Sequence, residues 1–106
     1  MSAEWDDLLQ QVLEPNESAT ALARARDAAL VVSERRVLIL TGDRKTLDVP
    51  FDRLRRVQFD IERNRPATLV LVPEHPSDEP QVLPIPAEEY RAVAEVLVRI
   101  GEKLHG

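Results

Sequence analysis

Seven short runs rich in Val, Leu and Ile, separated by polar clusters, occupy residues 18 to 85. In order, the runs are ATALARA, ALVVS, RVLILT, TLDVP, RVQFDIE, TLVLV and QVLPI. Apolar runs of this length, spaced in this way, are typical of consecutive antiparallel strands. In the fifth run Val57, Phe59 and Ile61 alternate with polar residues, which predicts one buried and one solvated face. The sequence therefore predicts a mainly β fold.

The links between these runs have the composition of turns. Residues 33–36, SERR, form a tight connection between the second and third runs, and the last arginine begins the outgoing strand. Gly42 is available for a positive φ angle in a hairpin loop. The step from Leu54 to Val57 breaks the alternation and predicts a turn or bulge. Residues 73–80 contain three prolines and are expected to form a solvated loop.

An amphipathic helix is expected on each side of the strands. In residues 1–15 the apolar positions recur with helical spacing, and the face they form has to be buried against the same domain or against a partner subunit: Trp5, Leu8, Leu9, Val12 and Leu13. Residues 87–104 follow Pro86 and carry a longer apolar stripe that suits packing on a sheet: Tyr90, Val93, Val96, Leu97, Ile100 and Leu104. We expect a helix at 1–15 and a body at 16–106, in one compact domain.

Three motifs resemble those of a known family. LEPNES at 13–18, ALVVSERRVLIL at 29–40 and VPFDRLRRVQF at 49–59 are similar to motifs of the bacterial pleckstrin-homology-like domains, which are related in fold to GRAM and eukaryotic pleckstrin-homology domains. The resemblance covers about residues 13 to 104. It implies an α+β, mainly β fold: a small barrel or sandwich of about seven antiparallel strands, capped by a C-terminal helix. The N-terminal helix would be an addition.

Positive charge is concentrated in the middle of the chain. Residues 1–23 hold five acids and no base, residues 24–65 hold eleven bases against seven acids, and residues 66–106 hold three bases against seven acids. One interpretation is an arginine-rich solvated surface. The other is an anion-binding patch, because guanidinium groups suit phosphates and carboxylates. The candidates for such a patch are Arg24, Arg26, Arg35, Arg36, Arg53, Arg55 and Arg56.

The family resemblance also bears on these arginines. Many pleckstrin-homology domains that bind phosphoinositides use basic residues around the first strand pair. The corresponding segment here is RARD, in which Arg24 and Arg26 lie on one strand face. This segment departs from the lipid-binding pattern, because it contains no lysine and because Asp27 directly follows Arg26.

Several classes of function are not expected. The chain has no cysteine, which excludes disulfides, thiolate catalysis and cysteine-ligated zinc. His75 and His105 have neither a catalytic nor a metal-binding spacing, so we expect no enzyme, no catalytic residue, no metal and no cofactor. With one Trp, one Tyr and two Phe, nucleic-acid binding is not expected either. The acidic N-terminus and short apolar runs indicate a soluble, cytoplasmic protein that is not exported.

Two functional hypotheses remain. The first is a protein-interaction or assembly module, which joins partners or further copies through exposed sheet edges and through the helix face of Trp5, Leu8, Leu9 and Val12. The second is a peripheral membrane or anionic-ligand binder that uses the arginine-rich middle of the chain.

Overall fold

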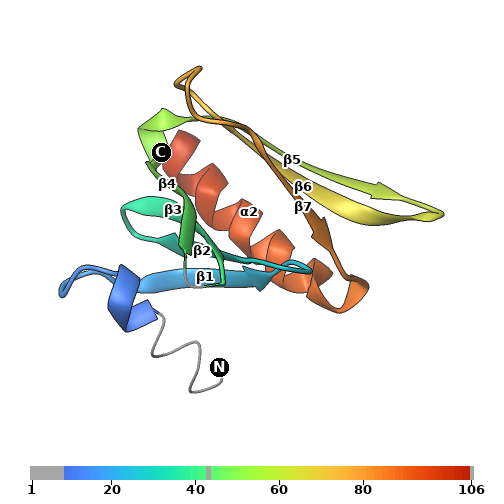
Figure 1. Cartoon of the computed structure of the whole chain (residues 1–106), viewed down its shortest axis with the longest axis horizontal. Coiled ribbons are helices and arrows are strands. Elements are labelled where there is room, and N and C mark those ends of the chain that lie inside the picture. Colours follow the sequence, from blue (N-terminus) through green and yellow to red (C-terminus); the bar gives the residue numbers. More distant parts are fainter. Residues whose placement is uncertain (1–8, 43, 106) are drawn as a thin grey trace.

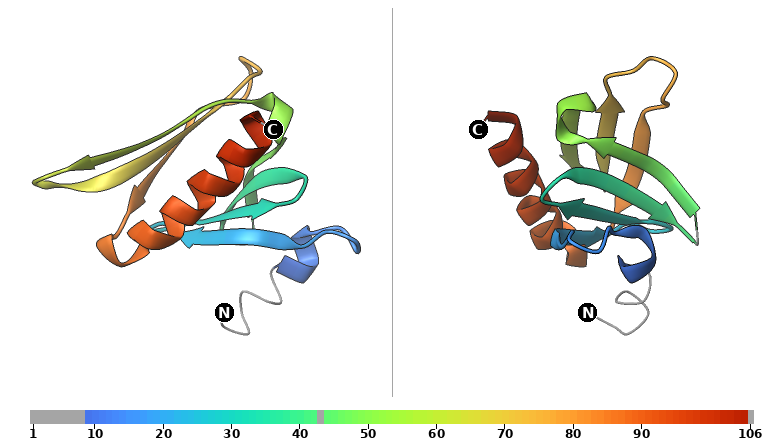
Figure 2. Two further views of the ribbon diagram at one scale, coloured as in Figure 1. Left: turned by 180° about the vertical axis from the view of Figure 1, so that it is seen from behind. Right: turned by 90° about the vertical axis from the view of Figure 1, so that its left-hand side faces the viewer.

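The computed structural model describes residues 9–42 and 44–105, and two antiparallel sheets organise them. Strands β1 (Ala19–Arg24), β2 (Ala29–Ser33), β3 (Arg36–Thr41) and β4 (Arg44–Pro50) form the first sheet in chain order. Strands β5 (Leu54–Glu62), β6 (Arg65–Pro73) and β7 (Gln81–Ile85) form the second. As Figures 1 and 2 show, the second sheet lies across the first, and a helix lies along one side of the two sheets.

The described residues outside the strands include several helical segments. The 3-10 turn η1 (Phe51–Arg53) links the two sheets, and η2 (Ala87–Glu89) leads into the long helix α2 (Tyr90–His105). Pro86 therefore precedes a 3-10 turn and does not begin the α-helix directly. At the N-terminal end, residues 9–12 are helical.

The strands and turns predicted from the sequence are confirmed. All seven apolar runs are strands, and residues 34 and 35 form the tight connection between β2 and β3. Gly42 has a φ of 65°, a left-handed conformation that glycine adopts without steric penalty. The predicted irregularity after Leu54 is a shift in the β5–β6 register between Leu54 and Arg56.

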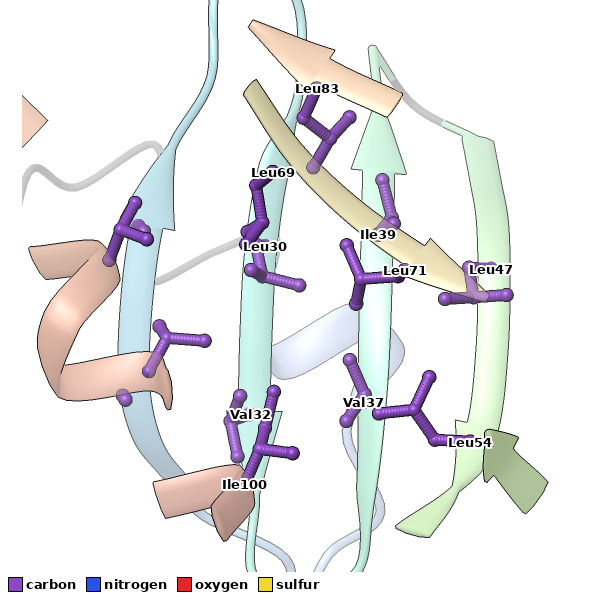
Figure 3. Packing of buried hydrophobic residues seen from close by; sticks show 14 of the residues in the cluster. Leu30, Val32, Val37, Ile39, Leu47, Leu54, Leu69, Leu71, Leu83 and Ile100 are labelled. Carbon is purple, nitrogen blue, oxygen red and sulfur yellow. The ribbon is translucent and has the colours of Figure 1, made fainter. Parts of the chain in front are cut away.

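The main core lies between the two sheets and α2. Figure 3 shows Leu69 and Leu71 of β6 over Leu30 of β2 and Ile39 of β3, all of them fully or almost fully buried. Three residues of the predicted helical stripe close the core: Val93, Val96 and Ile100. Each side chain of this kind stabilises the fold by about 1.5–3 kcal/mol when it is removed from water.

A second, smaller cluster covers the outer face of the first sheet. Leu9 packs there with Val31 of β2 and with Leu38 and Leu40 of β3. Strands β2 and β3 are consequently buried on both faces, unlike the half-solvated strands of a simple antiparallel sheet. Figure 2 shows residues 9–15 lying against this outer face, away from the second sheet.

One predicted core position is wrong. Ile61 continues the alternation of Val57 and Phe59, but its side chain is 60% exposed, and the other two are only half-buried. The reason is that the β5–β6 hairpin extends past the first sheet and α2 (Figure 1), so that no layer covers its far end. Leu104, at the end of the helical stripe, is 43% exposed.

Candidate functional site

Arg36, the first residue of β3, is the centre of the most extensive polar network in the described residues. Its Nε and Nη2 atoms donate to the two carboxylate oxygens of Glu17, at 3.0 and 2.7 Å. Nη1 donates to both oxygens of Asp48 on β4, at 3.0 and 2.9 Å, and Nη2 also donates to the backbone carbonyl of Val12 at 2.9 Å. Such paired contacts to a carboxylate are strong and fix orientation.

The Glu17 carboxylate is completely buried and fully engaged. Besides Arg36, it accepts hydrogen bonds from Ser33 Oγ at 2.5 Å and from the backbone N–H of Glu14 at 3.0 Å. The hydrogen bond from Arg36 is the main cause that lowers the pKa of Glu17 to about 2, against the opposing effect of burial. The pKa of Arg36 is raised, chiefly by its hydrogen bond to Glu17.

Arg36 is therefore occupied within the chain. All three nitrogen atoms of its guanidinium group donate to Glu17, Asp48 or Val12, and an outside anion would have to displace one of the carboxylates. Arg36 is thus not available to bind an outside ligand. Glu17 was not among the candidate residues, and nothing in the local sequence LEPNES indicates its partner.

Arg35 stands beside this network at an exposed turn. The backbone N–H groups of Arg35 and Arg36 both donate to Ser33 Oγ at 3.1 Å, which is why a serine suits this connection. The Glu34 carboxylate accepts from the backbone N–H of Ser18, at 3.0 and 3.2 Å. The turn is thus fixed by side-chain contacts, while the Arg35 side chain lies in solvent.

Arg24 and Arg26 lie at the other end of the first sheet. Together with Asp27 and Gly42 they line a surface hollow of about 250 Å³ between the β1–β2 and β3–β4 connections. The backbone N–H of Arg24 donates to the Glu89 carboxylate at 2.8 Å, and that of Arg26 donates to the carbonyl of Pro84 at 3.1 Å. These contacts join the end of β1 to β7 and to the start of the C-terminal helical segment.

The third arginine group lies where the chain enters the second sheet. Arg53 lines a hollow of about 500 Å³ with residues 74–78, and Arg55 and Arg56 line another of about 350 Å³ with Val72. All three side chains are exposed. Because Arg24 and Arg26 lie at the opposite end of the first sheet from Arg35 and Arg36, the seven candidate arginines do not form one continuous patch.

The candidate interaction helix is placed only in part. Leu9 is 7% exposed and Val12 is half-buried, and both pack on the outer face of the first sheet. The burial of Leu9 and Val12 agrees with the first interpretation of this helix face, which is packing against the same domain. Trp5 and Leu8 lie outside the described residues.

His75 lies in the exposed loop that follows β6. His75 Nδ1 lies 2.6 Å from Ser77 Oγ and accepts from the Ser77 backbone N–H, which closes a local turn in an exposed loop. No three His, Cys, Asp or Glu side chains of residues 9–42 and 44–105 converge as metal ligands would. None of the helices described is long and apolar enough to cross a bilayer.

The sheet edges are the remaining candidate sites. Strands β1 and β4 end the first sheet and strands β5 and β7 end the second, and the backbone of Arg26, just after β1, donates to Pro84 of β7. The edges of β4 and β5 remain. Residues 45–49 of β4 line a hollow of about 300 Å³ shared with residues 77–79 and Gln81, so the edge of β4 faces the chain's own loop. Strand β5 is nine residues long, and every residue after Phe59 in it is exposed. Its edge is the longer and the more accessible of the two.

Among solved structures, two bacterial proteins share this arrangement. The pleckstrin homology domain from Shewanella amazonensis SB2B superposes with a TM-score of 0.69 at 16% identity, over 98% of each chain. A DUF1696 family protein with a pleckstrin-homology domain, from Shewanella loihica PV-4, superposes with a TM-score of 0.66 at 18% identity, over 93% of this chain and 92% of that one. No family model and no curated protein matches the sequence. The predicted resemblance to bacterial pleckstrin-homology-like domains is confirmed at the level of the fold.

The buried Glu17 carboxylate makes stability depend on pH. Its pKa is about 2 in the folded chain and ordinarily 4.5, so its stabilising contribution is complete above pH 4.5 and is lost as the pH falls toward 2. At about 1.4 kcal/mol for each pKa unit, the contribution reaches about 3 kcal/mol. We expect Glu17→Gln to lower the free energy of unfolding by about 2–3 kcal/mol at pH 7, and the deficit to shrink toward pH 2 in urea titrations.

The matched control is Glu79→Gln in the exposed loop, which should stay within about 0.5 kcal/mol of the unsubstituted protein at each pH. A Glu17→Gln deficit that does not change between pH 7 and pH 2 would show that the ion pair does not carry this stability.

Proposed function

We propose that this pleckstrin-homology-like domain is a non-enzymatic protein-interaction module that associates, with further copies or with a partner, through the open edge of its second sheet. The observation that carries the proposal is the edge strand β5, which projects beyond the rest of the fold (Figure 1). An unpaired strand edge presents a row of backbone donors and acceptors, and strand addition to such an edge is a common mode of protein recognition.

The burial of the other faces supports this choice of surface. The outer face of the first sheet is covered by residues such as Leu9, and its inner face by the core. The β4 edge faces residues 77–79. The second sheet, in contrast, bears the exposed apolar side chains of Ile61 and Val82, each 60% exposed.

The proposal predicts concentration-dependent association. In light scattering coupled to size exclusion, the mass should rise from the 12.0 kDa of one chain toward a multiple of it between low micromolar and near-millimolar concentration. Leu9→Ala serves as a comparison. It weakens packing on the first sheet, so it should lower stability by about 2–5 kcal/mol without removing association by folded chains. A constant mass of one chain throughout would contradict self-association.

A second function is supported by the arginines at the start of β5. In the described part of the chain, Arg53, Arg55 and Arg56 are exposed and have no ion-pair partner, and the last two flank an open hollow. Such a group could bind the phosphate of a lipid headgroup or of another anionic ligand. Positively charged side chains at one end of an edge strand are equally compatible with protein binding, so the two functions need separate tests.

Flotation with acidic and neutral vesicles tests this second function. If it holds, the protein should float with acidic vesicles only, and binding should fall steeply with salt because exposed charges are screened over about 10 Å at 0.1 M. Arg55→Ser with Arg56→Ser should reduce flotation several-fold, whereas Arg91→Ser on α2 should not. Absent flotation, or equal flotation with both kinds of vesicle, would count against membrane binding.

A further inference from the structure

We infer that β5 pairs antiparallel with β5 of a second copy, about a twofold axis that passes beside Gln58. The inference rests on the proposed interaction function and names its partner and register. It would join the second sheets of two copies into one sheet of six strands, three from each copy. Three properties of β5 lead to it.

The first property is the regular stretch of backbone. Between Arg56 and Asp60 the β5–β6 ladder is continuous, with each residue opposite one partner on β6. The register shifts before this stretch, between Leu54 and Arg56, and after it, between Asp60 and Glu62. Irregularities of this kind bend a strand and end regular pairing. The part of the edge that can accept another strand is therefore centred on Gln58.

The second property is the charge pattern on the outer face of this stretch. Arg56 and Asp60 lie two residues before and two residues after Gln58, on the same face, and both are exposed. Neither has an ion-pair partner among the described residues. An antiparallel twofold pair about Gln58 places each Arg56 opposite the Asp60 of the other copy. Opposite charges in directly opposed cross-strand positions stabilise a pair.

A side-chain hydrogen bond from Gln58 favours this pairing. Its side-chain Nε2 donates to both carboxylate oxygens of Asp60 at 3.0 Å, within the same strand. The carboxylate is thereby held on the outer face, on the side that an arginine from another copy would reach. On the twofold axis, Gln58 lies opposite its own copy, where an uncharged side chain avoids repulsion.

The third property is the apolar side of the same strand. Val57 and Phe59 are half-buried, and the Phe59 ring packs edge-to-face on Tyr90 with ring centroids 5.6 Å apart. In the proposed register Val57 of one copy lies opposite Phe59 of the other, on the core side of both sheets. Pairing would remove the remaining exposed surface of these two side chains from water.

Other registers lose these matches. A shift by one residue would turn Phe59 of one copy to the polar side of the other, because side chains alternate between faces. A shift that pairs residue 56 with itself, or residue 60 with itself, brings like charges together. A centre at Phe59 would require regular pairing through the irregularity after Asp60.

Charge reversal at the two positions tests the register. Arg56→Asp alone and Asp60→Arg alone each place like charges opposite one another twice in the twofold pair, so each should raise the dissociation constant at least tenfold. The double variant with both changes restores the opposition and should associate like the unsubstituted protein. A mixture of the two single variants should form a one-to-one heterodimer, because each supplies the charge that the other lacks.

Arg91→Asp on α2 is the matched control. It makes the same change of charge at an exposed position on the helix and not on β5, and should leave the dissociation constant within about twofold at moderate salt, where surface charges that are not directly opposed are screened. Circular dichroism spectra and thermal melts identify which variants are folded.

A cross-link gives a second test that does not depend on charge. The chain has no cysteine, so Gln58→Cys introduces a single thiol. Directly opposed cross-strand residues have Cβ atoms about 4.5–5.5 Å apart, close to the spacing of a disulfide, so mild oxidation should yield a covalent dimer. In the proposed register the two copies of residue 61 lie six residues apart along the strand, at about 20 Å. Ile61→Cys should therefore cross-link much more slowly.

The outcomes separate the inference from the function on which it rests. If the unsubstituted protein stays a single chain at all concentrations, self-association and this register both fail. Suppose instead that the unsubstituted protein associates. If the single charge variants then associate as tightly as it does, or if mixing the two single variants does not restore tight association, the β5 register is overturned and another surface carries the interaction. Equal cross-linking at positions 58 and 61 would also overturn it.

Discussion

The ion pair between Arg36 and Glu17 joins the segment before β1 to the sheet that follows it. Arg36 begins β3, yet its donors reach Glu17, the backbone of Val12 and Asp48 on β4. Because this contact holds residues 9–17 on the outer face of the first sheet, β2 and β3 can be apolar on both faces. Breaking it would leave a buried carboxylate without its cation, a costly state.

This arrangement gives the two sheets different roles. The first sheet is covered on one side by the core and on the other by residues 9–13, so it offers little apolar surface for a partner. The second sheet is covered on one side only, and its β5–β6 hairpin extends past the helix (Figure 1). The accessible backbone edge is therefore found on the same strand as Arg56 and Asp60, which have no ion-pair partner among the described residues.

Local patterns in the sequence were sufficient to predict the strands and the turn at residues 34 and 35, because alternation and turn composition depend on near neighbours. The contact from Glu17 to Arg36 spans 19 residues and depends on how the sheet folds back, which no local pattern encodes. Alternation also predicted a buried Ile61, because it separates the two faces of a strand without indicating whether another layer covers one of them. The arginines follow one another in sequence, but antiparallel strands carry Arg26 and Arg35 to opposite ends of one sheet.

The central claim is that the β5 edge is where copies of this chain meet, and backbone hydrogen exchange tests it residue by residue. Exchange is measured on the unsubstituted protein below and above the concentration at which its mass rises. We expect the amides within residues 56–60 whose N–H groups point away from β6 to gain protection at high concentration, while those of the β4 edge, residues 44–50, should not change. Protection that appears along β4, or no change in β5 while the mass rises, would contradict it.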